Sequence, residues 1–222
     1  MRENEALVDD LFEPVEDHTK LRVGVLISGS GTNLQALIDR CADGSVDAEV
    51  VVAVSNKHDA FGLERARRSG VDAVFIDRAA YTTFAAYNHA ITEAMCSRKV
   101  DLIVMAGYMR LLGNEVLTEF PDRVINLHPA LLPAFVGPSS ITDAFDHGVK
   151  VTGVTVHFAN ENFDEGPIIA QEAVTVDQDD TVQSLEAKIH EVEHRLLPMA
   201  VQLFAQGRLV IEGRKVRVLP EI

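Results

Sequence analysis

Three polar residues in the second half of the sequence have types and spacing suited to acyl transfer. Asn126 and His128 end an apolar run, so their side chains project from the same side of a strand, and Pro129 favours an extended backbone at His128. An amide can donate a hydrogen bond to a developing oxyanion, and an imidazole beside it can exchange a proton. The residues alone leave a second interpretation open, in which both side chains only cap the following loop.

A carboxylate follows in a later loop. Asp164 lies in the turn-rich stretch NENFDEGPII, residues 160–169, directly after a strand-like run. A carboxylate near an imidazole favours the protonated ring, which would stabilise an oxyanion and carry a proton. The sequence does not show that the two meet, because Asp-Glu-Gly-Pro is also an ordinary turn composition. His157, in the alternating run TVHF, is interpreted as a structural or supporting residue.

A glycine-containing loop lies near the start of the sequence. The stretch ISGSGTNLQALI, residues 27–38, leads from an apolar strand into a helix that Asn33 begins. Small residues let backbone N–H groups converge at a helix start, where phosphate is favoured. The stretch lacks the GK[ST] of a Walker loop, and Leu34 occupies the last position of the dinucleotide pattern GxGxxG. It predicts a phosphate site of another kind, with a plain strand-to-helix turn as the alternative.

The elements that position these residues follow an alternating pattern. Short β-branched runs are separated by helical stretches, which predicts a parallel sheet covered on both faces, with ligands at the carboxyl ends of the strands. The runs GVTVHF and KVRVL alternate in side-chain character, which indicates an antiparallel or edge addition to the sheet. A long helix is predicted near residues 181–207. The predicted strands cover residues 22–28, 49–56, 72–77, 101–107, 123–128, 152–158 and 168–174.

Composition restricts the class of protein. With 222 residues and 47% apolar content, the chain can bury one substantial α/β core. A formal charge of −14 disfavours nucleic acid and anionic membrane surfaces as partners, because both bind basic patches. Cys41 and Cys96 are far apart and form no CxxC pair, so neither a zinc site nor a disulfide framework is expected. Both cysteines are interpreted as reduced core residues.

The first residues differ from the rest of the chain. Residues 1–20 hold seven acidic and two basic side chains and no apolar stretch of a signal peptide, and no transmembrane run follows. These features predict an acidic tail at 1–20, a single domain at 21–222 and a cytoplasmic location. Within that domain we expect a nucleotide-binding half at about 21–120 and a catalytic half at about 121–222.

Three motifs in order resemble the glycinamide ribonucleotide formyltransferase family. They are ISGSGTNLQALI, then AGYMRLL leading to INLHPALLPAF, then TGVTVHFANENFDEGPIIAQ, and the resemblance extends from about Leu21 to the end. It implies the formyltransferase fold, a Rossmann-like, doubly wound and mostly parallel sheet with an antiparallel extension in the C-terminal half. It also implies formyl transfer from 10-formyltetrahydrofolate to the amine of glycinamide ribonucleotide in de novo purine biosynthesis, without a metal.

The same resemblance assigns roles to individual residues. Asn126, His128 and Asp164 match the family's catalytic set, and Glu193 would hydrogen-bond the ribose hydroxyls. The phosphate would bind at Ser30, Gly31, Thr32 and Asn33. The folate would lie along Tyr108, Met109, Arg110, Leu111 and Leu112, with Arg110 toward its glutamate tail.

The chain departs from the family pattern in the acceptor loop around Gly137. After LLP the family usually has an aromatic residue and then Pro-Gly-x-His, whereas this chain has the segment FVGPS at residues 135–139. The proline before the glycine and the histidine two residues after it are therefore replaced, which puts acceptor binding in question. An arginine that the family tends to have near the position of Phe84 is also absent.

Other functions remain as alternatives. Formyltetrahydrofolate hydrolases carry a similar second half, but they usually add an N-terminal regulatory domain and do not keep the SGSGTNLQ loop. Methionyl-tRNA formyltransferase needs a basic C-terminal domain, and this chain has a pI near 4.9. A module that binds folate or nucleotide without catalysis would have no chemical need for Asn126, His128 and Asp164 together. We expect small-molecule substrates as partners, and an exposed apolar helix face would allow a homodimer.

Overall fold

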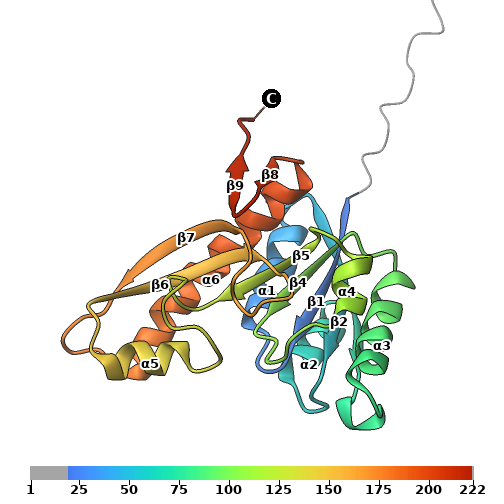
Figure 1. The fold of residues 1–222 in the computed structure, drawn as a ribbon, viewed down its shortest axis with the longest axis horizontal. Helices are drawn as coiled ribbons and strands as arrows, with labels where there is room; N and C mark the ends of the chain where they lie inside the picture. Colours follow the sequence, from blue (N-terminus) through green and yellow to red (C-terminus); the bar gives the residue numbers. More distant parts are fainter. Residues whose placement is uncertain (1–19, 222) are drawn as a thin grey trace, which may run out of the picture.

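One nine-stranded sheet connects the two halves of the chain within residues 20–221, the part that the computed structural model describes (Figure 1). The strand order is β3-β2-β1-β4-β5-β6-β7-β9-β8. Neighbouring strands from β3 to β5 are parallel, β6 is antiparallel to both β5 and β7, and β9 is parallel to β7 and antiparallel to β8. The predicted mostly parallel α/β sheet with an antiparallel C-terminal extension is confirmed. The expected tail lies outside the described residues except for Lys20.

The elements follow the alternating pattern of the sequence. The strands are β1 Leu21–Ile27, β2 Ala48–Ser55, β3 Asp72–Phe75, β4 Leu102–Ala106, β5 Val124–His128, β6 Val151–Phe158, β7 Ile168–Thr175, β8 Leu209–Glu212 and β9 Lys215–Val218. The α-helices are α1 Thr32–Ala42, α2 Phe61–Arg68, α3 Phe84–Cys96, α4 Asn114–Glu119, α5 Ser140–His147 and α6 Val182–Ala205, and a 3-10 turn spans Arg78–Ala80.

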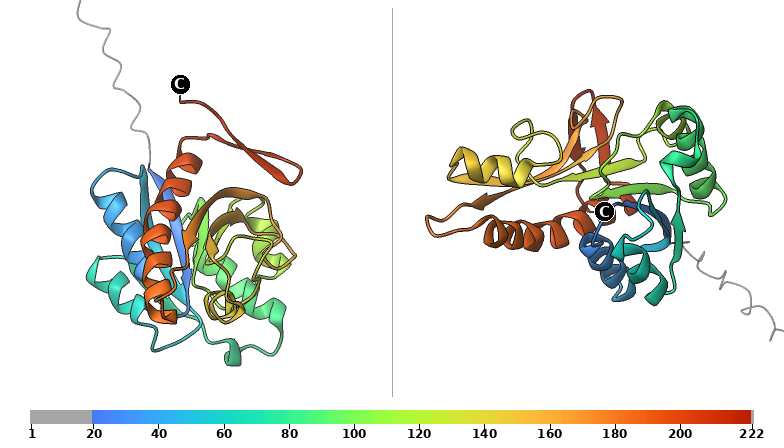
Figure 2. Two further views of the ribbon diagram at one scale, coloured as in Figure 1. Left: turned by 90° about the vertical axis from the view of Figure 1, so that its left-hand side faces the viewer. Right: turned by 90° about the horizontal axis from the view of Figure 1, so that it is seen from below.

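Helices cover both faces of the sheet (Figure 2). Side chains of β1 alternate between the faces, so Val25 packs in a cluster with α1, α2 and α6, whereas Leu26 packs in a second cluster with α3 and α4. On α1 the buried residues Leu34, Leu37 and Cys41 recur at helical spacing and face the sheet. Both faces of the parallel part are therefore buried, which explains its continuous apolar strands.

The two cysteines differ in environment. Cys41 is buried on α1, where burial raises the pKa of its thiol to about 11. Cys96 is exposed, so the prediction that it is a core residue is wrong. It is the last residue of α3 and follows the buried Met95, and one residue along a helix turns the side chain by about 100° away from the packed face. Both thiols are free.

Candidate active site

A cavity of about 610 Å³ lies at the carboxyl ends of β1, β4 and β5. Parallel strands bring the loops that follow them to one edge of the sheet, which explains why segments distant in the sequence line it together. The lining comes from both halves of the chain, namely residues 29–33, 105–111, 126–129 and 137–142 together with positions in the Asp164 loop and on α6.

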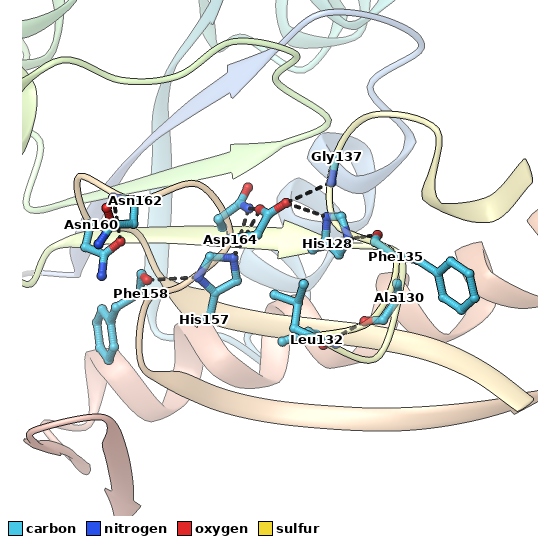
Figure 3. Close-up of polar contacts among 12 residues, drawn as sticks. His128, Ala130, Leu132, Phe135, Gly137, His157, Phe158, Asn160, Asn162 and Asp164 are labelled. Atoms are coloured by element: carbon cyan, nitrogen blue, oxygen red, sulfur yellow. Dashed lines mark hydrogen bonds and ion pairs between the residues drawn. The ribbon is translucent and has the colours of Figure 1, made fainter. Parts of the chain in front are cut away.

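Asp164 lines the cavity and contacts three segments, namely β5, β6 and the Gly137 loop (Figure 3). Its Oδ1 accepts a hydrogen bond from Asn126 Nδ2 at 3.1 Å, and its Oδ2 accepts one from the backbone N–H of Gly137 at 3.3 Å. The same Oδ2 lies 3.4 Å from His128 Nδ1. Asp164 and His128 are both buried, so little water screens this pair. The structure thus brings together the three residues that the sequence singled out.

His128 has an acceptor beside each ring nitrogen. Nε2 lies 2.9 Å from the backbone oxygen of Phe135, and Nδ1 faces the Asp164 carboxylate. A neutral imidazole carries one N–H and can satisfy only one of these acceptors, whereas an imidazolium donates to both. The surroundings therefore suit the protonated ring.

The pKa of Asp164 results from opposing effects. Burial raises it, but His157, His128 and the Gly137 amide together outweigh burial, so the pKa of Asp164 lies below its ordinary value. Asp164 is consequently ionised at neutral pH. Its negative charge is directed at the imidazole of His128.

His157 supports Asn126 from the neighbouring strand. The antiparallel register pairs Asn126 with His157, and Asn126 Nδ2 lies 3.0 Å from His157 Nε2. His157 Nδ1 lies 2.9 Å from the Phe158 carbonyl, and Nε2 also lies 3.7 Å from Asp164 Oδ1. Asn126 Nδ2 thus has two neighbouring partners, His157 Nε2 and Asp164 Oδ1.

The backbone around the site adopts unusual conformations. Phe135 and Asp164 have φ values of 51° and 55°, which lie in the left-handed region that residues other than glycine rarely adopt. Gly137 has a φ of 99°, a conformation that requires glycine. Each strained residue costs about 1–3 kcal/mol and persists only where other contacts hold it. Here the contacts are those of the Phe135 oxygen with His128 and of Asp164 with Asn126, His128, Gly137 and His157.

The loop before α1 forms one end of the cavity. Gly31 precedes the helix with a φ of 71°, and a Cβ there would lie 2.5 Å from the Cα of Gly62, so only glycine fits. Arg65 Nε donates to the backbone oxygen of Ser30 at 2.9 Å, which anchors the loop. The helix begins at Thr32, one residue earlier than predicted. Its N-terminus faces the cavity, as an anion site requires.

Glu193 lies beside this loop. Its Oε2 accepts from Asn33 Nδ2 at 2.9 Å and lies 2.7 Å from His190 Nδ1. His190 and Glu186 also line the cavity, and neither was predicted from the sequence. Their spacing of three and four residues on the predicted long helix was the available signal, because such residues share one helix face.

The segment expected to bind folate follows β4 and lies beside the loop before α1, because the Met109 N–H donates to Ser28 Oγ at 2.9 Å. Tyr108, Met109, Arg110 and Leu111 line the cavity, whereas Leu112 does not and packs instead against the cluster formed with α3 and α4. Met109 and Leu111 are exposed apolar side chains. The Tyr108 hydroxyl lies 2.6 Å from that of Tyr87 inside the protein, and burial raises the pKa of Tyr108.

Comparison with known proteins identifies the family. The family model described as formyl transferase matches residues 21–201, which is most of the chain. The chain belongs to the formyl transferase family. Phosphoribosylglycinamide formyltransferase from Bacillus subtilis is 39% identical and matches 82% of this chain and 93% of its own length. A crystal structure of glycinamide ribonucleotide transformylase 1 from Symbiobacterium toebii has a TM-score of 0.90 and 53% identity, covering 92% of this chain and 96% of that one.

Larger relatives contain the same unit. The trifunctional purine biosynthetic protein adenosine-3 of Bos taurus is 42% identical to this chain. The match covers 88% of this chain and 20% of that protein. The chain therefore spans about a fifth of the length of such trifunctional relatives. Together these matches confirm the resemblance to the glycinamide ribonucleotide formyltransferase family that the motifs indicated.

Neither a metal cluster nor a membrane-spanning helix occurs in residues 20–221 of this formyl transferase family member. No group of three or more His, Cys, Asp or Glu side chains in this range is arranged to hold a metal ion. None of its helices combines the length and apolarity needed to cross a bilayer.

Proposed function

We propose that the chain transfers the formyl group of 10-formyltetrahydrofolate to the amine of glycinamide ribonucleotide, a step of de novo purine biosynthesis. The observation that carries the proposal is the contact of the Asp164 carboxylate with both Asn126 and His128 inside the cavity. The names of the Bacillus subtilis and Symbiobacterium toebii relatives support the same acceptor and the transfer of a formyl group. We further propose that both substrates are bound as free small molecules in the cytoplasm.

The proposed reaction begins with attack of the acceptor amine on the formyl carbon. As the new C–N bond forms, negative charge develops on the formyl oxygen. Protonated His128 keeps Nδ1 toward Asp164 and exchanges the Nε2 contact with the Phe135 oxygen for a hydrogen bond to the formyl oxygen. Asp164 stabilises the imidazolium through the contact at 3.4 Å. The amine then loses a proton, the bond to the folate nitrogen breaks, and that nitrogen receives a proton through Asp164 and water.

Asn126 must give up one existing hydrogen bond before it can donate to the formyl oxygen. Its Nδ2 already has two partners, Asp164 Oδ1 at 3.1 Å and His157 Nε2 at 3.0 Å. We propose that the bond to Asp164 is exchanged for the formyl oxygen, since Asp164 then keeps the Gly137 amide and His128 as partners. His157 keeps the amide oriented throughout.

The two substrates would bind along neighbouring segments of the cavity lining. The ribonucleotide phosphate is proposed to bind the backbone at Ser30, Gly31, Thr32 and Asn33, with Glu193 on the ribose. The folate is proposed to lie along residues 108–111, with Arg110 near its glutamate tail. Leu112 would act by packing behind this segment.

The Gly137 loop would position the acceptor through its contact with Asp164 rather than through a histidine side chain.

One assay tests the proposal. Purified protein is incubated with 10-formyltetrahydrofolate, with and without glycinamide ribonucleotide, and both tetrahydrofolate and free formate are measured. We expect tetrahydrofolate to form only when the acceptor is present, with no formate released. Formate release that is independent of the acceptor would identify a hydrolase, and binding without turnover would identify an inactive module.

A further inference from the structure

An ionisable side chain that the proposed mechanism does not use lines the phosphate-loop end of the cavity. His190 lies on α6, with Nδ1 at 2.7 Å from Glu193 Oε2 and Nε2 at 3.6 Å from Glu186 Oε1. Glu193 is buried and also accepts a hydrogen bond from Asn33 in the first turn of α1. His190 is therefore linked through a single carboxylate to the proposed phosphate site.

Charged and titratable groups from two helices act on this position. On α6, Glu186 precedes His190 by one turn, and Glu193 and His194 follow it by one turn. On α2, the positive charge of Arg65 contributes to lowering the pKa of His194. The rings of His190 and His194 are stacked, with centroids 6.0 Å apart and planes 3° from parallel.

The two histidines favour different protonation states. The hydrogen bond with Glu193 raises the pKa of His190, whereas burial and then the charge of His190 lower the pKa of His194. Of the two stacked rings, His190 therefore holds its second proton to the higher pH, and it is the ring that lines the cavity. When His190 is neutral, the carboxylates of Glu186 and Glu193 lose the positive charge of the ring that lies beside both of them.

We propose that protonated His190 is a positioning residue for the phosphorylated acceptor, because it balances Glu186 and Glu193 where the anion binds. The inference rests on the proposed function and adds a pH dependence to acceptor binding. The Nδ1–H of His190 keeps Glu193 oriented toward the ribose whether the ring is neutral or protonated. The proton on Nε2 gives the ring its positive charge, which offsets the repulsion between the two carboxylates and the phosphate of the acceptor. The acceptor therefore binds more weakly once His190 loses this proton.

The test compares KM for glycinamide ribonucleotide from about pH 6 to about pH 9 in the wild type, His190→Gln and His190→Lys. In the wild type we expect KM to rise about fivefold across this range as the cation is lost. In His190→Gln, KM should be high at all pH values. In His190→Lys it should stay low, because an ammonium keeps its charge over the range.

Three controls isolate the effect. Ionisation of the substrate is common to all variants and cancels in the comparison. KM for 10-formyltetrahydrofolate, which is proposed to bind along residues 108–111 rather than at His190, should not follow the same pH profile. His89→Gln changes an exposed histidine on α3 that does not line the cavity, and it should reproduce the wild-type curve.

The outcomes separate this inference from the proposed function. If the wild type shows acceptor-dependent turnover but His190→Gln has the same pH profile, the inference is overturned and the proposed function stands. If no variant transfers a formyl group to the acceptor, the proposed function fails, and the inference fails with it. An NMR titration in which His190 loses its proton at a lower pH than the exposed His89 would also overturn the inference.

Discussion

At the scale of single residues, Asp164 is the group on which the proposed chemistry depends. It is buried, ionised and in contact with an amide, an imidazole and a backbone N–H. Its negative charge faces the His128 imidazole in a site with little water. Replacement by an uncharged residue of the same shape separates the role of charge from the role of packing.

Asp164→Asn and His128→Ala should therefore reduce kcat strongly. Loss of one oxyanion donor costs about 3 kcal/mol in comparable sites, so we expect a decrease of about a hundredfold or more in each variant. Steady-state formyl transfer measures the effect, and circular dichroism confirms that the variants are folded. Near-wild-type kcat in folded Asp164→Asn would remove this residue from the mechanism.

Gly137 offers a prediction based on the backbone. Its φ of 99° disfavours any side chain, although no atom lies within 4 Å of the position that a Cβ would take. Gly137→Ala should destabilise the fold by about 1–2 kcal/mol and, because its amide contacts Asp164, lower turnover by about tenfold or more. Gly44→Ala is the matched control, since Gly44 has a φ of 81° and equally open space but lies outside the cavity. It should cost stability without lowering turnover.

At the scale of elements, β6 holds the loop that follows His128. Thr155 is buried on β6, where its Oγ1 donates to the Ala130 carbonyl at 2.7 Å and accepts from the Leu132 amide at 3.1 Å. Gln171 on β7 adds a bond to the same hydroxyl at 2.9 Å. The strand added antiparallel to the parallel sheet thus fixes the path of the chain toward the Phe135 carbonyl.

Thr155→Val should break this network at nearly constant volume. The unpaired backbone groups cost about 1–3 kcal/mol of unfolding free energy, and turnover should fall because the Phe135 oxygen moves away from His128. Thr152→Val is a control on the same strand, because the buried Thr152 hydroxyl has no hydrogen-bond partner within residues 20–221. Urea unfolding should show no loss of stability there, and an equal loss in both variants would contradict the argument.

At the scale of the whole molecule, the site also links stability to pH. The pKa of Asp164 is lower in the folded protein than in the unfolded chain. Its ionised form therefore stabilises the fold above the unfolded pKa of about 4, and this contribution is lost as the pH falls below that value. The link follows from placing a carboxylate between strands β5 and β6 and the Gly137 loop.

The unfolding free energies of the wild type and Asp164→Asn should consequently converge in acid. We expect the wild type to be more stable at neutral pH, and the difference to narrow below about pH 4. Urea midpoints measured at a series of pH values test this, with Asp146→Asn, which changes an exposed carboxylate on α5, as the control. A difference that stays constant into acid would show that the charge of Asp164 does not stabilise the fold.

The sequence by itself determined the alternation of strands and helices, the glycine loop and the pairing of Asn126 with His128 on one strand face. These features depend on periodicity and on local backbone geometry, which neighbouring residues set. Only the tertiary structure decided that Asp164 reaches His128, that Leu112 lies behind the cavity, that Cys96 is exposed and that His190 contacts Glu193. Those contacts join segments or helix faces whose positions depend on strand order, register and packing, and no local pattern specifies them.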